Sequence, residues 1–130
     1  MQKCKYLDDL GLKINEYGTN FMTDNDPRSS KWAKERKEYG FDVRETWNLD
    51  RTFVEWIYTR VLMYKERNCV DTSFHKVLYK DDLITQQEAM DIILDLAKQI
   101  LLDMDNDELR LNNLRGICDL WKEILPIMWW

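Results

Sequence analysis

The sequence is poor in histidine, glycine and cysteine, and each shortage excludes a class of site. With a single histidine, His75, any Ser–His or Cys–His catalytic pair would have to use that one imidazole. Four glycines, with no GxGxxG or P-loop spacing, argue against a phosphate-binding loop. Cys4, Cys69 and Cys118 are odd in number and lack CxxC spacing, which predicts reduced, mostly buried thiols rather than a disulfide framework.

Long apolar runs are also missing. No stretch of about 18 apolar residues occurs, so we expect no membrane span. The N-terminal stretch MQKCKYLDDLGLK is charged throughout and has no apolar segment typical of a signal peptide, so we expect a cytoplasmic protein. The 130 residues, 45% hydrophobic and 33% charged, are typical of one folded domain over 1–130. Six tryptophans, six tyrosines and four phenylalanines predict an aromatic core, led by Trp56 and Trp121.

Apolar residues recur every three or four positions in several segments, which predicts a mostly α fold. The segments are 5–17, 48–67, 85–104 and 105–125, and a further, charged helix is expected over 27–40 from its end signals. Short loops between them favour a compact four- or five-helix bundle. Residues 73–84 break this period and alternate around a Lys-Asp-Asp turn, which predicts a short β-hairpin or extended excursion.

Several helix ends carry capping signals. Aspartate before proline favours a helix start, glycine favours a helix end, and Thr or Asp followed three residues later by Glu forms a capping box. The residues with these signals are Asp26 before Pro27, Gly40, Thr85 with Glu88, and Asp105 with Glu108.

The periodic residues predict which helix faces are buried. The segment 48–67 is apolar around most of its circumference, so we expect it to be the central helix. Its expected core residues are Phe53, Trp56, Ile57, Arg60, Val61 and Tyr64, and its polar stripe is Arg51, Glu55 and Thr59. In the last helix the expected core residues are Leu111, Leu114, Cys118, Trp121 and Leu125.

Charge is distributed unevenly. Residues 1–70 hold 13 Lys and Arg against 12 Asp and Glu, whereas residues 71–130 hold 6 against 12. Within 81–108, nine acids stand against one base, Lys98. Because DNA binding needs clustered Lys and Arg, we expect no direct nucleic-acid binding by this half of the chain.

The acids of this segment form the first candidate site. Glu88, Asp91 and Asp95 recur at three- and four-residue spacing, so they share one helix face, and Asp81 and Asp82 precede them. One interpretation is a solvated face without a specific role. The other is a strip that binds a protein partner with a basic surface, for example the nucleic-acid groove of another protein, with fast and salt-sensitive association.

Two sets of aromatic residues give further candidates. Trp129 and Trp130 either pack back against the bundle or form exposed anchors for a partner. Trp47, with Arg51 and Arg60, could form a pocket for a nucleotide-like ligand, which a thermal-shift screen would detect. An enzyme with a carboxylate site has the least support.

The alternating acids Asp103, Asp105 and Asp107 resemble the start of a calcium loop. An EF-hand loop would need glycine where Glu108 stands and glutamate where Leu114 stands. We therefore expect no bound metal and no cofactor.

The run Trp47-Asn48-Leu49-Asp50 and the ending Met128-Trp129-Trp130 carry a resemblance to a known group, as do the stretches Tyr39–Asp42 and Phe74–Lys76. Over about residues 35–130 the chain resembles a family of small uncharacterised proteins of bacteriophages and prophages of Gram-positive gut bacteria. The resemblance implies a phage accessory protein acting in the host cytoplasm. Such a protein could inhibit a host defence system, such as a CRISPR nuclease, or serve another step of the phage cycle.

Overall fold

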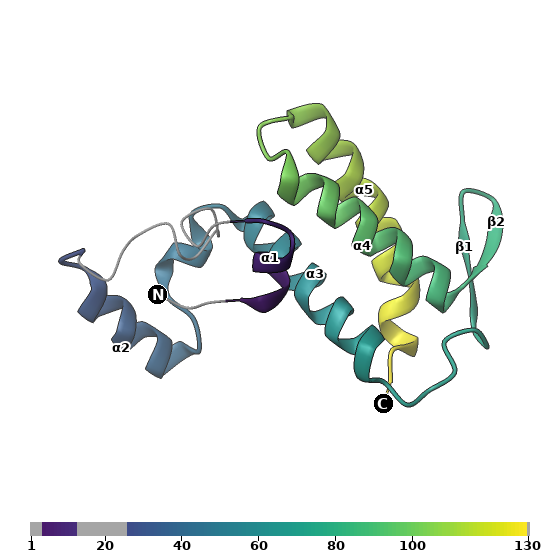
Figure 1. The fold of residues 1–130 in the computed structure, drawn as a ribbon, viewed down its shortest axis with the longest axis horizontal. Helices are drawn as coiled ribbons and strands as arrows, with labels where there is room; N and C mark the ends of the chain where they lie inside the picture. Colours follow the sequence, from purple (N-terminus) through teal and green to yellow (C-terminus); the bar gives the residue numbers. More distant parts are fainter. Residues whose placement is uncertain (1–3, 13–25, 130) are drawn as a thin grey trace. The chain divides into compact units, whose positions relative to one another are not determined.

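The computed structural model describes residues 4–12 and 26–129 (Figure 1). The chain divides into two compact units, Met1–Trp56 (unit 1) and Ile57–Trp130 (unit 2). Helix α3 (Leu49–Arg67) begins in unit 1 and ends in unit 2. The described residues form five α-helices and one two-stranded antiparallel sheet, which confirms the mostly α fold with a short hairpin. That all 130 residues form one domain stays a prediction.

Unit 1 contains α1 (Lys5–Asp9), α2 (Ser29–Tyr39) and the 3-10 helix η2 (Val43–Thr46). The helix expected over 5–17 is described only as far as residue 12, and within that range it ends at Asp9. The rest of that segment and most of the loop expected after it lie outside the described residues.

The two predicted ends of α2 differ in outcome. Gly40 ends the helix with φ of 86°, and its N–H donates to the carbonyl of Arg36, as predicted. Asp26 does not cap the helix, because the N-cap residue is Arg28. The Asp26 carboxylate instead accepts bonds from the Arg28 backbone N–H (2.8 Å) and from its guanidinium (3.0 Å). The Asp26 carboxylate thus binds Arg28, the residue at which the helix is capped, two positions after the expected cap.

A buried carboxylate, Asp42, lies in the interior of the described part of unit 1 and is 3% exposed. It accepts bonds from Arg36 (2.6 Å) and, at both oxygens, from the buried Arg44 (2.9 and 2.8 Å). The Arg44 guanidinium lies 4.5 Å from the ring centroid of Trp32, which is 2% exposed. Ion pairs and a cation–π contact thus contribute to the stability of unit 1 in a place where many domains have apolar side chains.

Unit 2 contains the end of α3, strands β1 (Lys76–Tyr79) and β2 (Asp82–Thr85), helices α4 (Gln86–Leu102) and α5 (Asp107–Ile124), and the 3-10 helix η3 (Leu125–Ile127). The hairpin turn is Lys80–Asp81, and both residues have positive φ, 48° and 67°. This is the geometry of a type I′ turn, which matches the twist of the strands.

The start of α4 is capped as predicted. The Thr85 side chain accepts a bond from the Glu88 N–H, and the Glu88 carboxylate accepts one from the Thr85 N–H. The start of α5 is capped by a different residue from the one expected. Asn106, not Asp105, is the N-cap and accepts a bond from the Leu109 N–H (3.1 Å).

Helices α4 and α5 pack side by side and enclose an aliphatic core (Figure 1). The fully buried large side chains of unit 2 include Ile57 of α3 and Met90, Ile93, Ile100, Ile117, Leu120 and Ile124 of α4 and α5. The expected tryptophan-led core is therefore wrong. Trp56 is 44% exposed and Trp121 is only partly buried, and among the described tryptophans Trp32 alone is fully buried.

The buried faces of two helices also differ from the prediction. In α3 the buried residues are Val54, Glu55, Ile57, Tyr58, Thr59 and Val61, whereas Arg60 is exposed. In α5 the buried residues are Asn113, Ile117, Leu120 and Ile124. Each of them comes one position before a predicted core residue, namely Leu114, Cys118, Trp121 and Leu125. One position rotates a helix by about 100°. Cys118 is consequently exposed rather than buried, and Cys69, which follows the end of α3, is exposed as well.

Candidate partner-binding site

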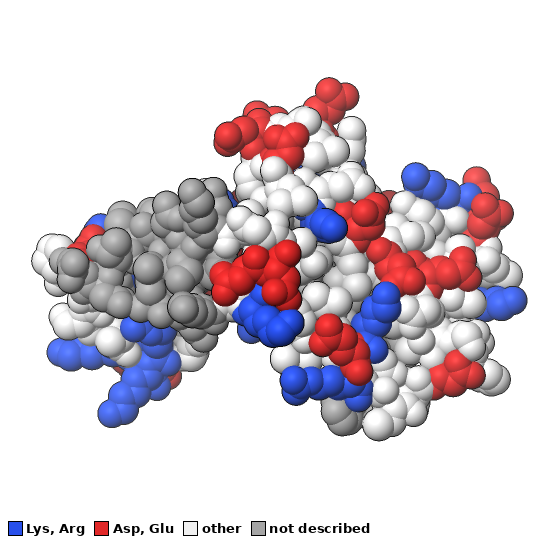
Figure 2. All heavy atoms as spheres, in the orientation of Figure 1, with Lys and Arg blue, Asp and Glu red and all other residues white. Residues whose placement is uncertain are grey.

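The acidic strip, defined as Glu88, Asp91 and Asp95, lies on the exposed side of α4. In the view of Figure 2 acidic side chains follow this helix, while Lys and Arg predominate over α2. Each strip residue has a local role as well. Glu88 closes the capping box, Asp91 pairs with Lys65 of α3, and Asp95 accepts a bond from Gln99 (2.9 Å).

The two acids that precede the strip lie on the hairpin. Asp81 occupies the turn and Asp82 begins β2, and both are exposed. Asp81 also lines a groove that is described next, whereas Asp82 does not. The five predicted acids therefore belong to two elements, the hairpin and α4.

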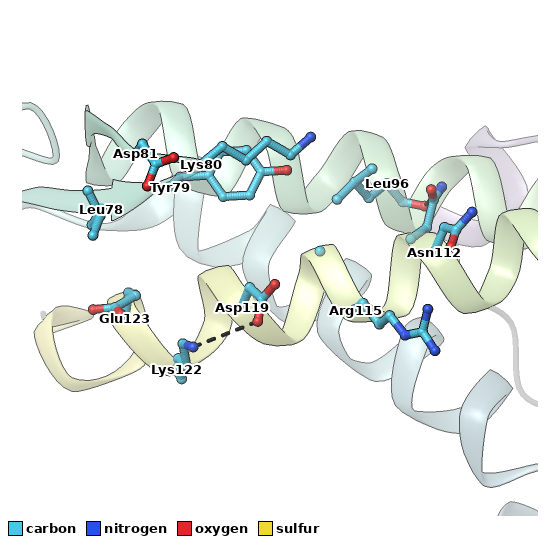
Figure 3. A pocket seen from close by; sticks show the side chains of 12 residues that line it. Leu78, Tyr79, Lys80, Asp81, Leu96, Asn112, Arg115, Asp119, Lys122 and Glu123 are labelled. Carbon is cyan, nitrogen blue, oxygen red and sulfur yellow. Dashed lines mark hydrogen bonds and ion pairs between the residues drawn. The ribbon is translucent and has the colours of Figure 1, made fainter.

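A groove of about 590 Å³ lies between the hairpin and α5 (Figure 3). The hairpin contributes Leu78, Tyr79, Lys80 and Asp81, and α4 contributes Leu96. The lining residues from α5 are Asn112, Asn113, Arg115, Gly116, Asp119, Lys122 and Glu123. Volumes of this size are typical of sites that hold small molecules or short chain segments.

Gly116 allows the neighbouring elements to approach α5 at the groove. A β-carbon at this position would lie 2.9 Å from Cδ1 of Leu96 and 3.8 Å from the hydroxyl of Tyr79. The first distance is too short for two carbon atoms, so a larger residue would force Leu96 to move. The glycine thus sets the spacing between α4 and α5 and leaves the floor of the groove without a side chain.

The groove carries balanced charge. Its rim holds three bases, Lys80, Arg115 and Lys122, and three acids, Asp81, Asp119 and Glu123. Lys122 pairs with Asp119 at 3.7 Å, and the Lys80 ammonium lies 5.2 Å from the ring centroid of Tyr79. A net-neutral rim of this kind does not select strongly for an anion or a cation.

The candidate ligand residues Trp47, Arg51 and Arg60 each contact near neighbours. Trp47 meets Trp32 edge-on at 6.2 Å, and Arg51 donates to Glu55 (3.2 Å). Arg60 lies in unit 2 and donates to Thr59 (2.9 Å). None of the three lines the groove, or a second hollow of about 300 Å³ beside Tyr39, Phe41 and Val43 in unit 1.

The end of the chain presents an exposed aromatic side chain. Trp129 is 70% exposed, its indole N–H donates to the carbonyl of Pro126 (2.9 Å), and its own carbonyl accepts a bond from the Tyr64 hydroxyl (2.6 Å). The backbone is therefore held against α3 while the ring faces solvent. The other half of this candidate, Trp130, lies outside the described residues.

The lone histidine is exposed and lies edge-on to Phe74, with 5.2 Å between ring centroids. Within the described ranges 4–12 and 26–129, no group of three or more His, Cys, Asp and Glu residues could hold a metal ion. No helix in the same ranges is long and apolar enough to cross a membrane.

Comparisons with protein families, with curated proteins and with solved structures found no match. The resemblance to phage proteins therefore stays a prediction.

The sequence patterns do not identify the groove, because its residues come from three elements that are separated in the chain. The one local signal is Gly116, an isolated glycine inside a periodic helical segment. Such a glycine costs about 1 kcal/mol relative to alanine, so its presence indicates a packing or functional reason.

Proposed function

We propose that this protein acts without catalysis, by binding a protein partner with a basic surface through the acidic strip. The observation that carries the proposal is the exposure of Glu88, Asp91 and Asp95 along about 10 Å of one side of α4. Unit 2, which contains α4, holds 13 Asp and Glu against 9 Lys and Arg. Such a surface attracts a basic partner and speeds its association.

The local bonds of the strip leave it available to a partner. Lys65 and Asp91 are 37% and 48% exposed, and a solvated pair of this kind contributes about 1 kcal/mol or less. A cation of the partner can therefore replace Lys65 at little cost. Glu88 keeps its capping role through one oxygen, Oε1, which leaves the other oxygen for a second donor.

More specifically, we propose that the partner is a nucleic-acid-binding effector of host defence, such as a CRISPR nuclease. Two features support it: carboxylates spaced along a rigid helix, and the resemblance of residues 35–130 to small phage proteins. A row of carboxylates can occupy a groove whose Lys and Arg otherwise contact phosphates.

The test compares two variants with the same change of charge. Glu88→Gln/Asp91→Asn/Asp95→Asn neutralises the strip, and glutamine still fits a capping box. Asp105→Asn/Asp107→Asn/Glu108→Gln neutralises three exposed acids elsewhere. The wild-type protein, mixed with a panel of purified CRISPR effectors, should inhibit target-DNA cleavage by at least one of them. The strip variant should bind that effector about tenfold more weakly, and the second variant within about threefold of wild type.

Binding should also weaken as salt is raised. Unchanged cleavage with every effector type would contradict the specific form of the proposal. Equal losses in the two variants would show that net charge, and not the strip, drives association.

A further inference from the structure

We propose that the groove between β1 and α5 binds an extended segment of the protein partner, which adds to the free edge of β1 as a third strand. This inference rests on the proposed function, because it specifies how a protein partner is held. It depends on the hydrogen-bond phase of the hairpin, on the position of the groove relative to β1, and on the groove's shape and charge.

The hydrogen-bond phase determines which backbone groups of β1 are free. The register pairs Tyr79 with Asp82 and Val77 with Ile84, and the Gln86 N–H donates to the His75 carbonyl (2.9 Å). Hydrogen-bonded pairs alternate with non-bonded ones in an antiparallel ladder. Lys76 and Leu78 therefore point their N–H and C=O groups away from β2, and no described residue bonds to these groups of Leu78.

The groove opens at this free edge. Leu78 and Tyr79 are consecutive, so their side chains point to opposite faces of the strand, yet both line the groove. A cavity that touches both is not confined to one face of the strand. No residue of β2 lines the groove, so the groove borders the edge of β1 that does not pair with β2.

The shape of the groove fits a single chain segment. Leu78 and Leu96 provide apolar walls (Figure 3). Gly116 also lines the groove and adds no side chain to it. An added strand places alternate side chains on opposite sides. We expect the segment to set one apolar side chain toward Leu96 while its backbone bonds to Leu78, which is the recognition mode of β-strand addition.

The charge of the groove favours a peptide over a nucleic acid. The rim holds equal numbers of acids and bases, and a polyanion would meet Asp81, Asp119 and Glu123 as well as the bases. A peptide backbone is neutral and needs paired donors and acceptors, which the edge of β1 supplies. The acidic strip and this groove thus have separate tasks: the strip attracts the basic partner, and the groove binds one of its segments.

The test uses two matched proline substitutions. Leu78→Pro removes the outward N–H at the groove, whereas Leu83→Pro removes the equivalent outward N–H at the opposite edge of the hairpin. The two leucines face each other across the ladder and are 56% and 69% exposed. Proline is tolerated where the N–H faces solvent, so both variants should keep the hairpin. Leu78→Ala separates the side chain from the N–H.

The probe is a phage-displayed library of random linear peptides, selected on the full-length protein and counter-selected on Leu78→Pro. Enriched peptides, synthesised with a fluorophore, should bind wild type and Leu83→Pro equally well and Leu78→Pro about tenfold more weakly. Hydrogen exchange of the wild-type protein gives a second measurement that needs no variant. The Leu78 amide should gain protection when an enriched peptide is added, and the Leu83 amide should not.

The inference is overturned if no peptide is enriched over the Leu78→Pro background, if both proline variants lose binding equally, or if the Leu78 amide is not protected. Its failure is distinguishable from failure of the proposed function. Neutralising the strip should weaken binding of basic protein partners but leave the affinity of a neutral groove-bound peptide within about twofold.

Discussion

Asp42 is the acceptor that holds together the polar interior of unit 1. It follows Gly40 by two residues, caps η2 through the Arg44 N–H (3.0 Å), and binds the side chains of Arg36 and Arg44. Removing its charge would take from the buried Arg44 guanidinium the carboxylate that binds it at two points. Loss of one partner from a buried pair is far more costly than the pair itself is stabilising.

We therefore expect Asp42→Asn to lower the free energy of unfolding of unit 1 by about 3 kcal/mol. The control is Asp107→Asn, which also removes a carboxylate from an arginine, Arg110, but at a site that is 85% exposed. The control should cost about 0.5 kcal/mol. Urea denaturation measures both values, and similar losses in the two variants would contradict the central role of Asp42.

Asp42 also makes the stability of unit 1 depend on pH. Burial by itself would raise the pKa of Asp42, but bonds from Arg44 and Arg36 outweigh it and hold the pKa below its ordinary value of 3.8. Stability from this carboxylate is therefore complete above pH 3.8 and is lost as the pH falls through the lowered pKa. In urea melts at a series of pH values, Asp42→Asn should abolish this part of the acid sensitivity.

Among the secondary-structure elements, the hairpin turn holds two residues in a backbone conformation that their side chains do not favour. Lys80 and Asp81 both adopt positive φ, where side chains with a β-carbon are disfavoured and asparagine and glycine are preferred. The strands and their packing against α4 and α5 impose this conformation on them. The conflict falls at the rim of the groove, where both side chains line the wall.

Lys80→Asn/Asp81→Gly should consequently stabilise unit 2 by about 1 kcal/mol, measured as a rise in its thermal midpoint. Asp105→Gly is the matched control, because Asp105 lies in a turn but has no positive φ. That substitution should be neutral or slightly destabilising, since it adds backbone freedom without relieving strain. A destabilised Asn-Gly variant would show that the two side chains are needed for packing.

The helix ends show how local signals compete. Thr85 and Glu88 have no strong competitor nearby and form their capping box. Asp26 lies two residues before Arg28, which is the N-cap of α2, and its carboxylate binds the Arg28 guanidinium. These charge-assisted bonds lower the pKa of Asp26 to about 2. Before α5, Asn106 is one residue closer to the helix than Asp105 and takes the cap instead. Capping motifs in sequence therefore locate a helix start to within one or two residues.

At the scale of the whole molecule, the two units have unequal apolar cores. Of the 16 buried hydrophobic residues in the described chain, unit 1 holds three: Leu7, Trp32 and Val54. Unit 2 holds the other 13. Because burial of apolar surface is the main favourable term in folding, we expect unit 2 to be the more stable.

Hydrogen exchange under native conditions tests this difference. Amides of α4 and α5 should be protected to a greater degree than those of α2, and Asp42→Asn should reduce protection in α2 while leaving α4 and α5 almost unchanged. Thr85→Ala, which removes the cap of α4 in unit 2, serves as the reciprocal control. Uniform protection across α2, α4 and α5, with both variants lowering it everywhere, would instead show one cooperative domain over residues 1–130.

The positions of the helices and strands follow from local sequence signals. Periodicity predicted α3, α4 and α5, end signals predicted α2, and alternation predicted the hairpin, while Gly40 and Thr85 marked two helix ends. These signals act between residues close together in the chain. Tertiary structure decided which faces are buried. α3 is apolar on most sides, so its own sequence does not select Val54, Ile57 and Val61 over Trp56 as the buried residues. The buried face of α5, which packs against α4, contains Ile117 and Leu120 and is shifted by one residue from the predicted face. The groove, likewise, exists only where β1 and α5 come together around Gly116, since no single segment contains it.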